Sequence, residues 1–183
     1  MAAKLSGKRV LLVIAPEQFR DEELFQPQAI FKSEGAHTTI AACKLGEAKG
    51  MLGGTVQPDL LISDVKAENY DACVVIGGMG SPTYLWNDSD LHNILQSMQK
   101  QNKVVAAICL SGAVLANAGV LKGKKATVWA MPESLESLKN GGAHYVNEPV
   151  VQDGFVVTAD GPEAANRFGE AVVEVLASVS ASK

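Results

Sequence analysis

Short runs of apolar residues alternate along this chain with longer segments in which apolar residues recur at helical spacing. The apolar runs have the length and composition of strands buried on both faces, and they cover residues 9–15, 36–43, 70–76 and 104–108. Helical spacing covers residues 21–33, 90–101, 132–139 and 162–177. This alternation predicts an α/β fold with a mostly parallel sheet and helices on both of its faces.

Smaller elements are expected between these segments. Residues 50–64 contain paired glycines and a proline, and they predict a short hairpin excursion. A further strand is expected at 126–129, and two more at 146–151 and 155–158, on either side of a turn. No repeat, low-complexity segment or linker divides the 183 residues, so a single domain over 1–183 is expected.

Charge and cysteine content narrow the class of function. The net charge of −4, without a basic cluster, argues against a nucleic-acid partner. No apolar run reaches membrane-spanning length and the N-terminal residues lack a signal-peptide core, so we expect a cytoplasmic protein with no membrane contact. The 3 cysteines are odd in number and lack CxxC spacing, so neither a disulfide framework nor a metal site is expected.

Cys109 stands where the apolar run 104–108 turns directly into a small-residue helical segment, 111–118. Such a junction pushes the side chain out of the sheet and sets it at a helix N-terminus, where a thiolate is favoured. The pattern predicts a nucleophile elbow with a cysteine whose pKa is lowered. Cys43 and Cys73 lie inside apolar runs and are interpreted as core residues.

Glycines and a buried carboxyl are expected beside this elbow. The N–H groups of Gly77, Gly78 and Leu110 could form an oxyanion hole, with a phosphate cradle or a plain tight turn as the alternatives. The acidic segment 16–24 follows the first strand, and Glu23 is the carboxyl we place inward, ahead of Glu22 and Glu17. Beside a thiolate it would keep its proton and donate to sulfur.

The chain resembles the ThiJ/PfpI superfamily at these residues. The similarity rests on Ala107-Ile108-Cys109, on Glu23 four residues before Pro27, on Gly77-Gly78, and on the later segments 140–145 and 161–162. The resemblance implies a flavodoxin-like three-layer α/β sandwich, usually a homodimer, with a cysteine prone to oxidation. It covers nearly the whole chain.

Departures from the family pattern remove the expected imidazole base. Leu110 follows the cysteine where protease-like members have His, and Trp129 or Ala130 stands where deglycase-like members have a later His. Asp160 replaces an Arg of the family. Trp129 is a candidate for closing the pocket.

Two further points stay open from the sequence. His37, His92 and His144 are interpreted as solvated or structural side chains. Ser111 either binds a substrate oxygen or caps the elbow helix.

These residues support several functions. The first is a cofactor-independent enzyme acting on small reactive carbonyls or their protein adducts, as a glyoxalase or deglycase, through Cys109 and Glu23. The alternative is an oxidative-stress sensor that uses oxidation of Cys109. An intracellular cysteine peptidase and an isonitrile hydratase are further possibilities, the peptidase being weakened by the missing histidine.

Overall fold

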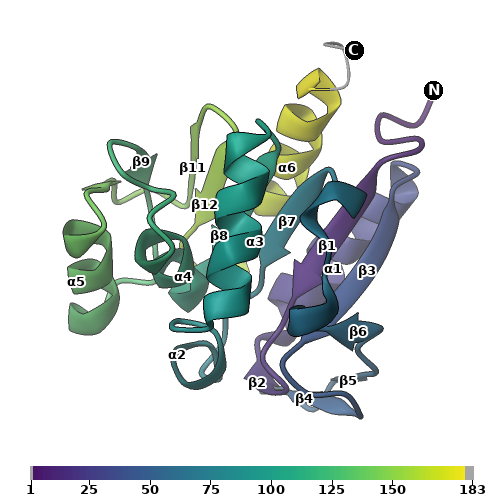
Figure 1. Ribbon diagram of the computed structural model, residues 1–183, viewed down its shortest axis with the longest axis horizontal. Coiled ribbons are helices and arrows are strands. Elements are labelled where there is room, and N and C mark those ends of the chain that lie inside the picture. The colour runs from purple at the N-terminus through teal and green to yellow at the C-terminus, as the bar shows by residue number, and fades with distance from the viewer. Residues whose placement is uncertain (1, 180–183) are drawn as a thin grey trace.

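The computed structural model describes residues 2–179. Its centre is a seven-stranded sheet of order β11-β12-β8-β7-β1-β3-β6, in which all neighbours are parallel except β11 and β12 (Figure 1). The strands are β1 (Arg9–Val13), β3 (His37–Ala42), β6 (Leu60–Leu61), β7 (Ala72–Val75), β8 (Val104–Ile108), β11 (Val150–Asp153) and β12 (Val156–Ala159). The predicted α/β class and parallel sheet are confirmed.

Helices cover both faces of the sheet. Figure 1 shows α3 in front of the sheet and α1 behind it, where α1 packs on α6. The helices are α1 (Asp21–Ser33), α2 (Ser81–Tyr84), α3 (Ser89–Lys100), α4 (Gly112–Asn117), α5 (Pro132–Asn140) and α6 (Ala165–Val179). Short 3-10 turns are η1 (Ile62–Asp64), η2 (Ala67–Asn69), η3 (Cys109–Ser111) and η4 (Pro162–Ala164). No helix within residues 2–179 is both long and apolar enough to cross a membrane.

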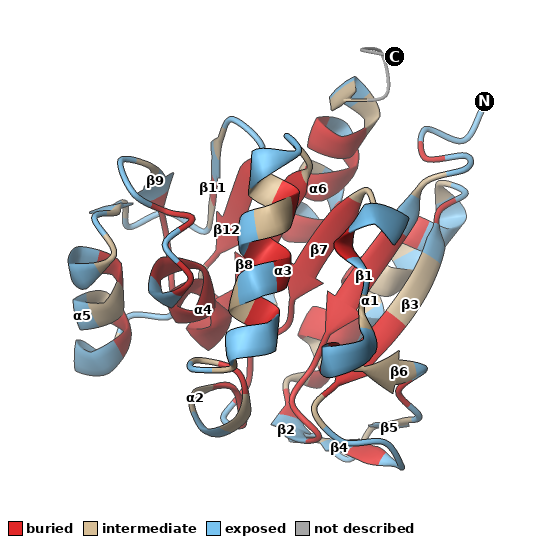
Figure 2. Ribbon diagram, in the orientation of Figure 1, coloured by how far each residue is buried: buried red, intermediate tan, exposed pale blue. Residues whose placement is uncertain are grey.

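Alternation along β1 builds the two hydrophobic layers. Val10, Leu12 and Ile14 face the layer of α1 and α6, whereas Leu11 and Val13 face the layer of α3 and α4. Successive side chains of a strand point to opposite faces, so a strand between two helical layers is apolar at every position. Figure 2 shows the central strands almost wholly buried.

Two small sheets flank the main one. A three-stranded sheet joins β2 (Glu17–Phe19), β4 (Ala48–Gly50) and β5 (Thr55–Val56), and β9 (Lys125–Ala126) pairs with β10 (His144–Tyr145). The hairpin expected over residues 50–64 is displaced, because the antiparallel pair β4–β5 lies at residues 48–56 and β6 belongs to the main sheet. The strand expected at 126–129 is wrong beyond Ala126, because Thr127 donates its N–H to the side-chain hydroxyl of Thr158 at 2.9 Å instead of to a backbone carbonyl of a paired strand.

Candidate active site

The carboxyl ends of β1, β7 and β8 lie side by side at one edge of the sheet, because these strands are adjacent and parallel. Open parallel sheets bind ligands beyond this edge. β8 leads directly into Cys109, β7 leads into Gly77, and β1 is followed by β2 and the first turn of α1, which carries Glu23. The topology therefore brings together the segments that the sequence singled out.

Cys109 has an unusual backbone conformation at the end of β8. Its φ of 61° lies in the left-handed region, which residues other than glycine seldom adopt. The chain passes from β8 into η3 without a loop, and α4 begins only at Gly112. The sharp strand-to-helix turn is confirmed, but a 3-10 turn separates the cysteine from the α-helix.

The Glu23 carboxyl is wholly buried against Cys109. Its Oε1 accepts the Gly77 N–H at 3.1 Å. A Cβ on Gly77 would lie 2.5 Å from this oxygen and 2.6 Å from the Cys109 Cβ, so carboxyl and cysteine flank the same point. Oε2 has no hydrogen-bond partner within residues 2–179. The Cys109 thiol and the Glu23 carboxyl are close enough for each to shift the pKa of the other. Only glycine fits between them.

Burial dominates the electrostatics of the pair. Desolvation raises the pKa of Glu23 to about 8, while the neighbouring Cys109 thiol and the Gly77 N–H act in the opposite direction. Burial also raises the pKa of the Cys109 thiol, and the Glu23 carboxylate raises it further. The prediction of a lowered thiol pKa is therefore wrong, because Cys109 is only 7% exposed and does not sit at the α-helix N-terminus. The pair accommodates one negative charge far more readily than two.

Backbone N–H groups lower the pKa of the Cys109 thiol against the larger effect of burial. They belong to Leu110 and Gly78 and favour a negative charge on the sulfur. The sequence also assigned the Gly77 N–H to an oxyanion hole, but this group binds the Glu23 carboxyl instead. Gly78 has a φ of 113°, and a Cβ there would lie 2.4 Å from the Gln18 carbonyl oxygen, so the donor at this position requires glycine.

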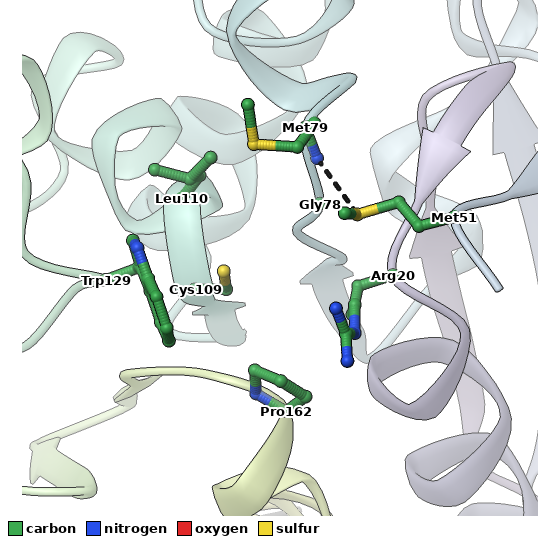
Figure 3. Close-up of a pocket in the computed structure, with 8 residues that line it drawn as sticks. All are labelled: Arg20, Met51, Gly78, Met79, Cys109, Leu110, Trp129 and Pro162. Carbon is green, nitrogen blue, oxygen red and sulfur yellow. Dashed lines mark hydrogen bonds between the residues drawn. The ribbon is translucent and has the colours of Figure 1, made fainter.

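A cavity of about 120 Å³ opens over Cys109. Figure 3 shows Arg20 on one side of the sulfur, Trp129 on the other, and Pro162 between them at the base. The wall is mostly apolar, and its lining residues are Arg20, Met51, Gly78, Met79, Cys109, Leu110, Trp129 and Pro162. A small, largely apolar chamber with a thiol, a buried carboxyl behind it and two backbone N–H groups has the functional groups that addition to a polar carbonyl group requires.

Family comparison agrees with this geometry. A model described as the DJ-1/PfpI family matches residues 8–175. The chain belongs to the DJ-1/PfpI family. An uncharacterized protein of Methanocaldococcus jannaschii is 47% identical over 172 residues, covering 94% of this chain and 84% of that protein. A protein named a deglycase from Pyrococcus abyssi is 33% identical over 152 residues, covering 83% of this chain and 90% of its own.

Solved structures of the DJ-1/PfpI family share the fold. A ThiJ/PfpI domain protein from Brachyspira murdochii superposes with a TM-score of 0.88 at 36% identity, covering 94% of this chain and 99% of that chain. DJ-1beta of Drosophila melanogaster superposes with a TM-score of 0.81 at 28% identity, covering 93% and 90%. The sandwich expected from the resemblance is thus the observed architecture.

Of the two pocket candidates, one lines the cavity and one does not. Trp129 is half-exposed in the cavity wall, and its backbone N–H donates to the Cys109 carbonyl at 3.1 Å. Ser111 is wholly buried, donates to the Ile76 carbonyl at 2.6 Å and lies 2.7 Å from the Ser81 hydroxyl. It neither caps α4 nor reaches the cavity, so both interpretations of Ser111 are wrong. It ties the ends of β7 and β8 together.

The histidine expected in some relatives has no counterpart in the cavity wall. Within residues 2–179 no histidine lines the cavity, and His92 instead contacts the Trp86 carbonyl at 2.8 Å. Arg20, Met51, Met79 and Pro162 were missed by sequence reasoning. The prolines and glycines around Met51 and Pro162 marked turns, but nothing in the sequence indicated which side chains those turns deliver.

A wider polar cleft adjoins the cavity. Its volume is about 660 Å³, and it shares Arg20, Trp129 and Pro162 with the chamber over Cys109. Its other lining residues are Glu22, Gln26, Asp160, Gly161, Glu163 and Asn166. Within residues 2–179 no cluster of three His, Cys, Asp or Glu side chains has the arrangement of a metal site.

Proposed function

We propose that this protein acts on small reactive carbonyls or their protein adducts, with Cys109 as the nucleophile and Glu23 as the proton carrier. The observation that carries the proposal is the cavity-lining Cys109 held against a wholly buried carboxyl whose pKa is raised to about 8. A carboxyl that titrates near neutral pH can both accept and return a proton. No cofactor takes part in the proposed reaction.

For a 2-oxoaldehyde the steps balance without an external oxidant. The Cys109 sulfur attacks the aldehyde carbon, its proton passes to the Glu23 carboxylate, and the Leu110 and Gly78 N–H groups hold the new oxyanion. Glu23 next delivers that proton to the oxygen of the neighbouring ketone and, as a carboxylate again, carries a proton from the former aldehyde carbon to the ketone carbon while the oxyanion collapses to a carbonyl. This step oxidises the first carbon to a thioester and reduces the second to an alcohol. Water hydrolyses the thioester, releases the 2-hydroxy acid and restores the thiol.

Relatives that are named deglycases support this proposal. The proteins from Pyrococcus abyssi, Thermococcus kodakarensis and Pyrococcus horikoshii that are named deglycases are each 33% identical over 152 residues. A deglycase removes a carbonyl adduct from an amine or thiol, which begins with the same attack of a nucleophile on the carbonyl-derived carbon.

Lactate formation from methylglyoxal tests the proposal. The wild-type protein is expected to form lactate, and Cys109→Ser and Glu23→Gln are expected to form none while keeping the wild-type circular dichroism spectrum. Cys43→Ser is the matched control, since Cys43 is half-buried away from the cavity. No lactate from folded wild type, or undiminished lactate from Cys109→Ser, contradicts the proposal.

Oxidation of Cys109 is a second candidate function. Cys109 lines the cavity whereas Cys73 is wholly buried, and oxidized DJ-1 of Toxoplasma gondii, whose structure is solved, is 26% identical to this chain. The sulfur would attack peroxide, forming an S–O bond as the O–O bond breaks and water leaves. Mild peroxide is then expected to add two oxygens to the peptide containing Cys109. Equal oxidation of Cys43 and Cys73 contradicts this function.

A further inference from the structure

Arg20 is fixed beside the nucleophile by both its backbone and its side chain. It follows β2 at the start of α1, and its N–H donates to the Gly77 carbonyl at 3.0 Å. Its guanidinium forms a two-point ion pair with Glu22, from Nε to Oε1 and from Nη2 to Oε2, each at 3.0 Å. A guanidinium held at two points has a defined direction, so its remaining donors are pre-oriented.

Those remaining donors are available to a ligand. Both N–H groups of Nη1 and one of Nη2 have no partner within residues 2–179, and the side chain is 27% exposed. Arg20 lines the chamber over Cys109 and also the wider cleft, so it stands where the two join. Among the side chains lining the chamber, Arg20 is the one that carries a permanent charge. Figure 3 shows its guanidinium directed toward the space beside Cys109.

We propose that Arg20 is a specificity-determining residue that binds an anionic group of the substrate, a carboxylate carried by the reactive carbonyl compound. The bound anion would hold the carbonyl carbon over Cys109. This inference rests on the proposed function and deepens it, because it selects oxoaldehydes that bear a carboxylate over neutral ones of the same length.

The surroundings of Arg20 limit the size of that anion. Glu22 balances the charge of Arg20, and Asp160 and Glu163 line the cleft beyond it. A long polyanion would meet these carboxylates, whereas a single carboxylate at the junction meets the free edge of the guanidinium. The substrate class is therefore a short, singly anionic carbonyl compound.

A pair of alkylating reagents tests the inference without any turnover. Iodoacetate and iodoacetamide deliver the same carbon and the same iodide leaving group, but only iodoacetate is anionic. In each case a C–S bond forms at Cys109, the C–I bond breaks, and the thiol proton passes to Glu23 or to water. The rate ratio of iodoacetate to iodoacetamide is measured by intact mass and peptide mapping, with a free cysteine peptide as the reference.

At Cys109 of the wild type, the rate ratio of iodoacetate to iodoacetamide is expected to be about fivefold higher than in the free peptide. This is the effect expected of one partly exposed contact between opposite charges. Arg20→Gln should remove this excess, and Arg20→Lys should keep part of it. Glu22→Gln frees the guanidinium and should increase it, which tests the inference from the opposite direction if Arg20→Gln fails to fold. Arg9→Gln, at the opposite end of β1, makes the same charge change away from the site and should leave the ratio unaltered.

Two results overturn the inference. The first is a ratio that is the same in wild type, Arg20→Gln and Glu22→Gln. The second is equal slowing of both reagents in Arg20→Gln, which would make Arg20 an electrostatic support for the thiolate alone. Either result leaves the proposed function standing, because that function fails on the absence of lactate.

Substrate kinetics supply the corresponding measurement on turnover. 4,5-Dioxopentanoate carries a carboxylate and 2-oxohexanal is its neutral counterpart of similar length. Arg20→Gln is expected to raise KM for the anionic compound about fivefold, with little change in kcat and little effect on the neutral compound. An equal effect on the two compounds contradicts the inference.

Discussion

Glu23 and Cys109 compete for one negative charge in a largely buried site. The carboxyl is wholly buried and the cysteine is 7% exposed, so each ionised form loses most of its hydration. Two backbone donors face the sulfur and one faces the carboxyl, which is enough to stabilise a single anion. A proton can therefore pass between the two groups without a charge entering or leaving the site.

The raised pKa of Glu23 predicts a pH-dependent cost to stability. In the unfolded chain this carboxyl ionises near 4.5, but in the folded protein near 8, so between these values the folded state binds more protons. Wild-type stability should fall by up to about 1.4 kcal/mol per pH unit across this window. Glu23→Gln lacks this loss and should gain stability relative to wild type from pH 5 to pH 8, measured by urea unfolding. If the difference in the free energy of unfolding between the two proteins did not change with pH, the raised pKa of Glu23 would be contradicted.

Ser111 provides a stability prediction that separates structure from chemistry. Ser111→Ala leaves the Ile76 carbonyl and the Ser81 hydroxyl without a buried partner, so the free energy of unfolding should fall by about 1–3 kcal/mol. Ser178→Ala, which removes a local helix hydrogen bond to Val175, should cost less. Cys109 alkylation in the folded Ser111→Ala protein should stay near wild type. A large loss of Cys109 alkylation in this variant would show that Ser111 contributes to the site and not only to stability.

At the scale of elements, Asp21 shows how an acidic helix start becomes part of the site. Its carboxylate accepts the Leu52 and Gly54 N–H groups at 2.8 and 2.7 Å and holds the β4–β5 hairpin against α1. A Cβ on Gly50 would lie 2.5 Å from this carboxylate, so the hairpin packs tightly on it. The hairpin carries Met51 into the cavity wall.

Asp21→Ala should therefore loosen one wall of the cavity. Two backbone donors lose their acceptor, which should lower stability by about 1–3 kcal/mol and speed hydrogen exchange in residues 48–56. Asp88→Ala is the matched control, because Asp88 also accepts a backbone N–H, from Leu91 at 2.9 Å, but at the start of α3. Unchanged exchange of the hairpin in Asp21→Ala would show that other contacts hold it.

The sequence predicted those elements whose own pattern is strong. Residues 21–33 and 104–108 have the observed bounds of α1 and β8, since helical spacing and a continuous apolar run are local signals. β2, β6 and α2 were missed because elements of two to four residues have no period and form through tertiary pairing. Cys109 and Glu23 could be predicted because each follows a predicted strand and because the family resemblance includes both positions. Arg20 and Met79 reach the cavity only through the way that separate loops fold together.

At the scale of the molecule, the sheet order determines where the chemistry can occur. The adjacent parallel strands β1, β7 and β8 end at the same edge, and two hydrophobic layers hold them in register. Because β7 and β8 are apolar at every position, packing changes in either layer act on the sheet that both layers share.

The two layers are expected to unfold as one cooperative unit. Phe168→Ala in the α6 layer and Leu95→Ala in the α3 layer each remove a wholly buried side chain and should lower the free energy of unfolding by roughly 2–5 kcal/mol. In both variants, far-ultraviolet circular dichroism and tryptophan fluorescence should give one shared urea midpoint. Separate midpoints for the two signals would contradict a single cooperative core.

The coupling of Cys109 to Glu23 is tested most directly by the pH dependence of Cys109 alkylation with iodoacetamide. In wild type the rate is expected to rise with pH around a midpoint near the Glu23 pKa of about 8, because loss of one proton from the pair creates the reactive monoanion. In Glu23→Gln the buried thiol ionises without a neighbouring carboxyl, so the inflection near pH 8 should disappear and the rate should go on rising toward the raised pKa of the thiol. Superimposable profiles for the two proteins would contradict the account.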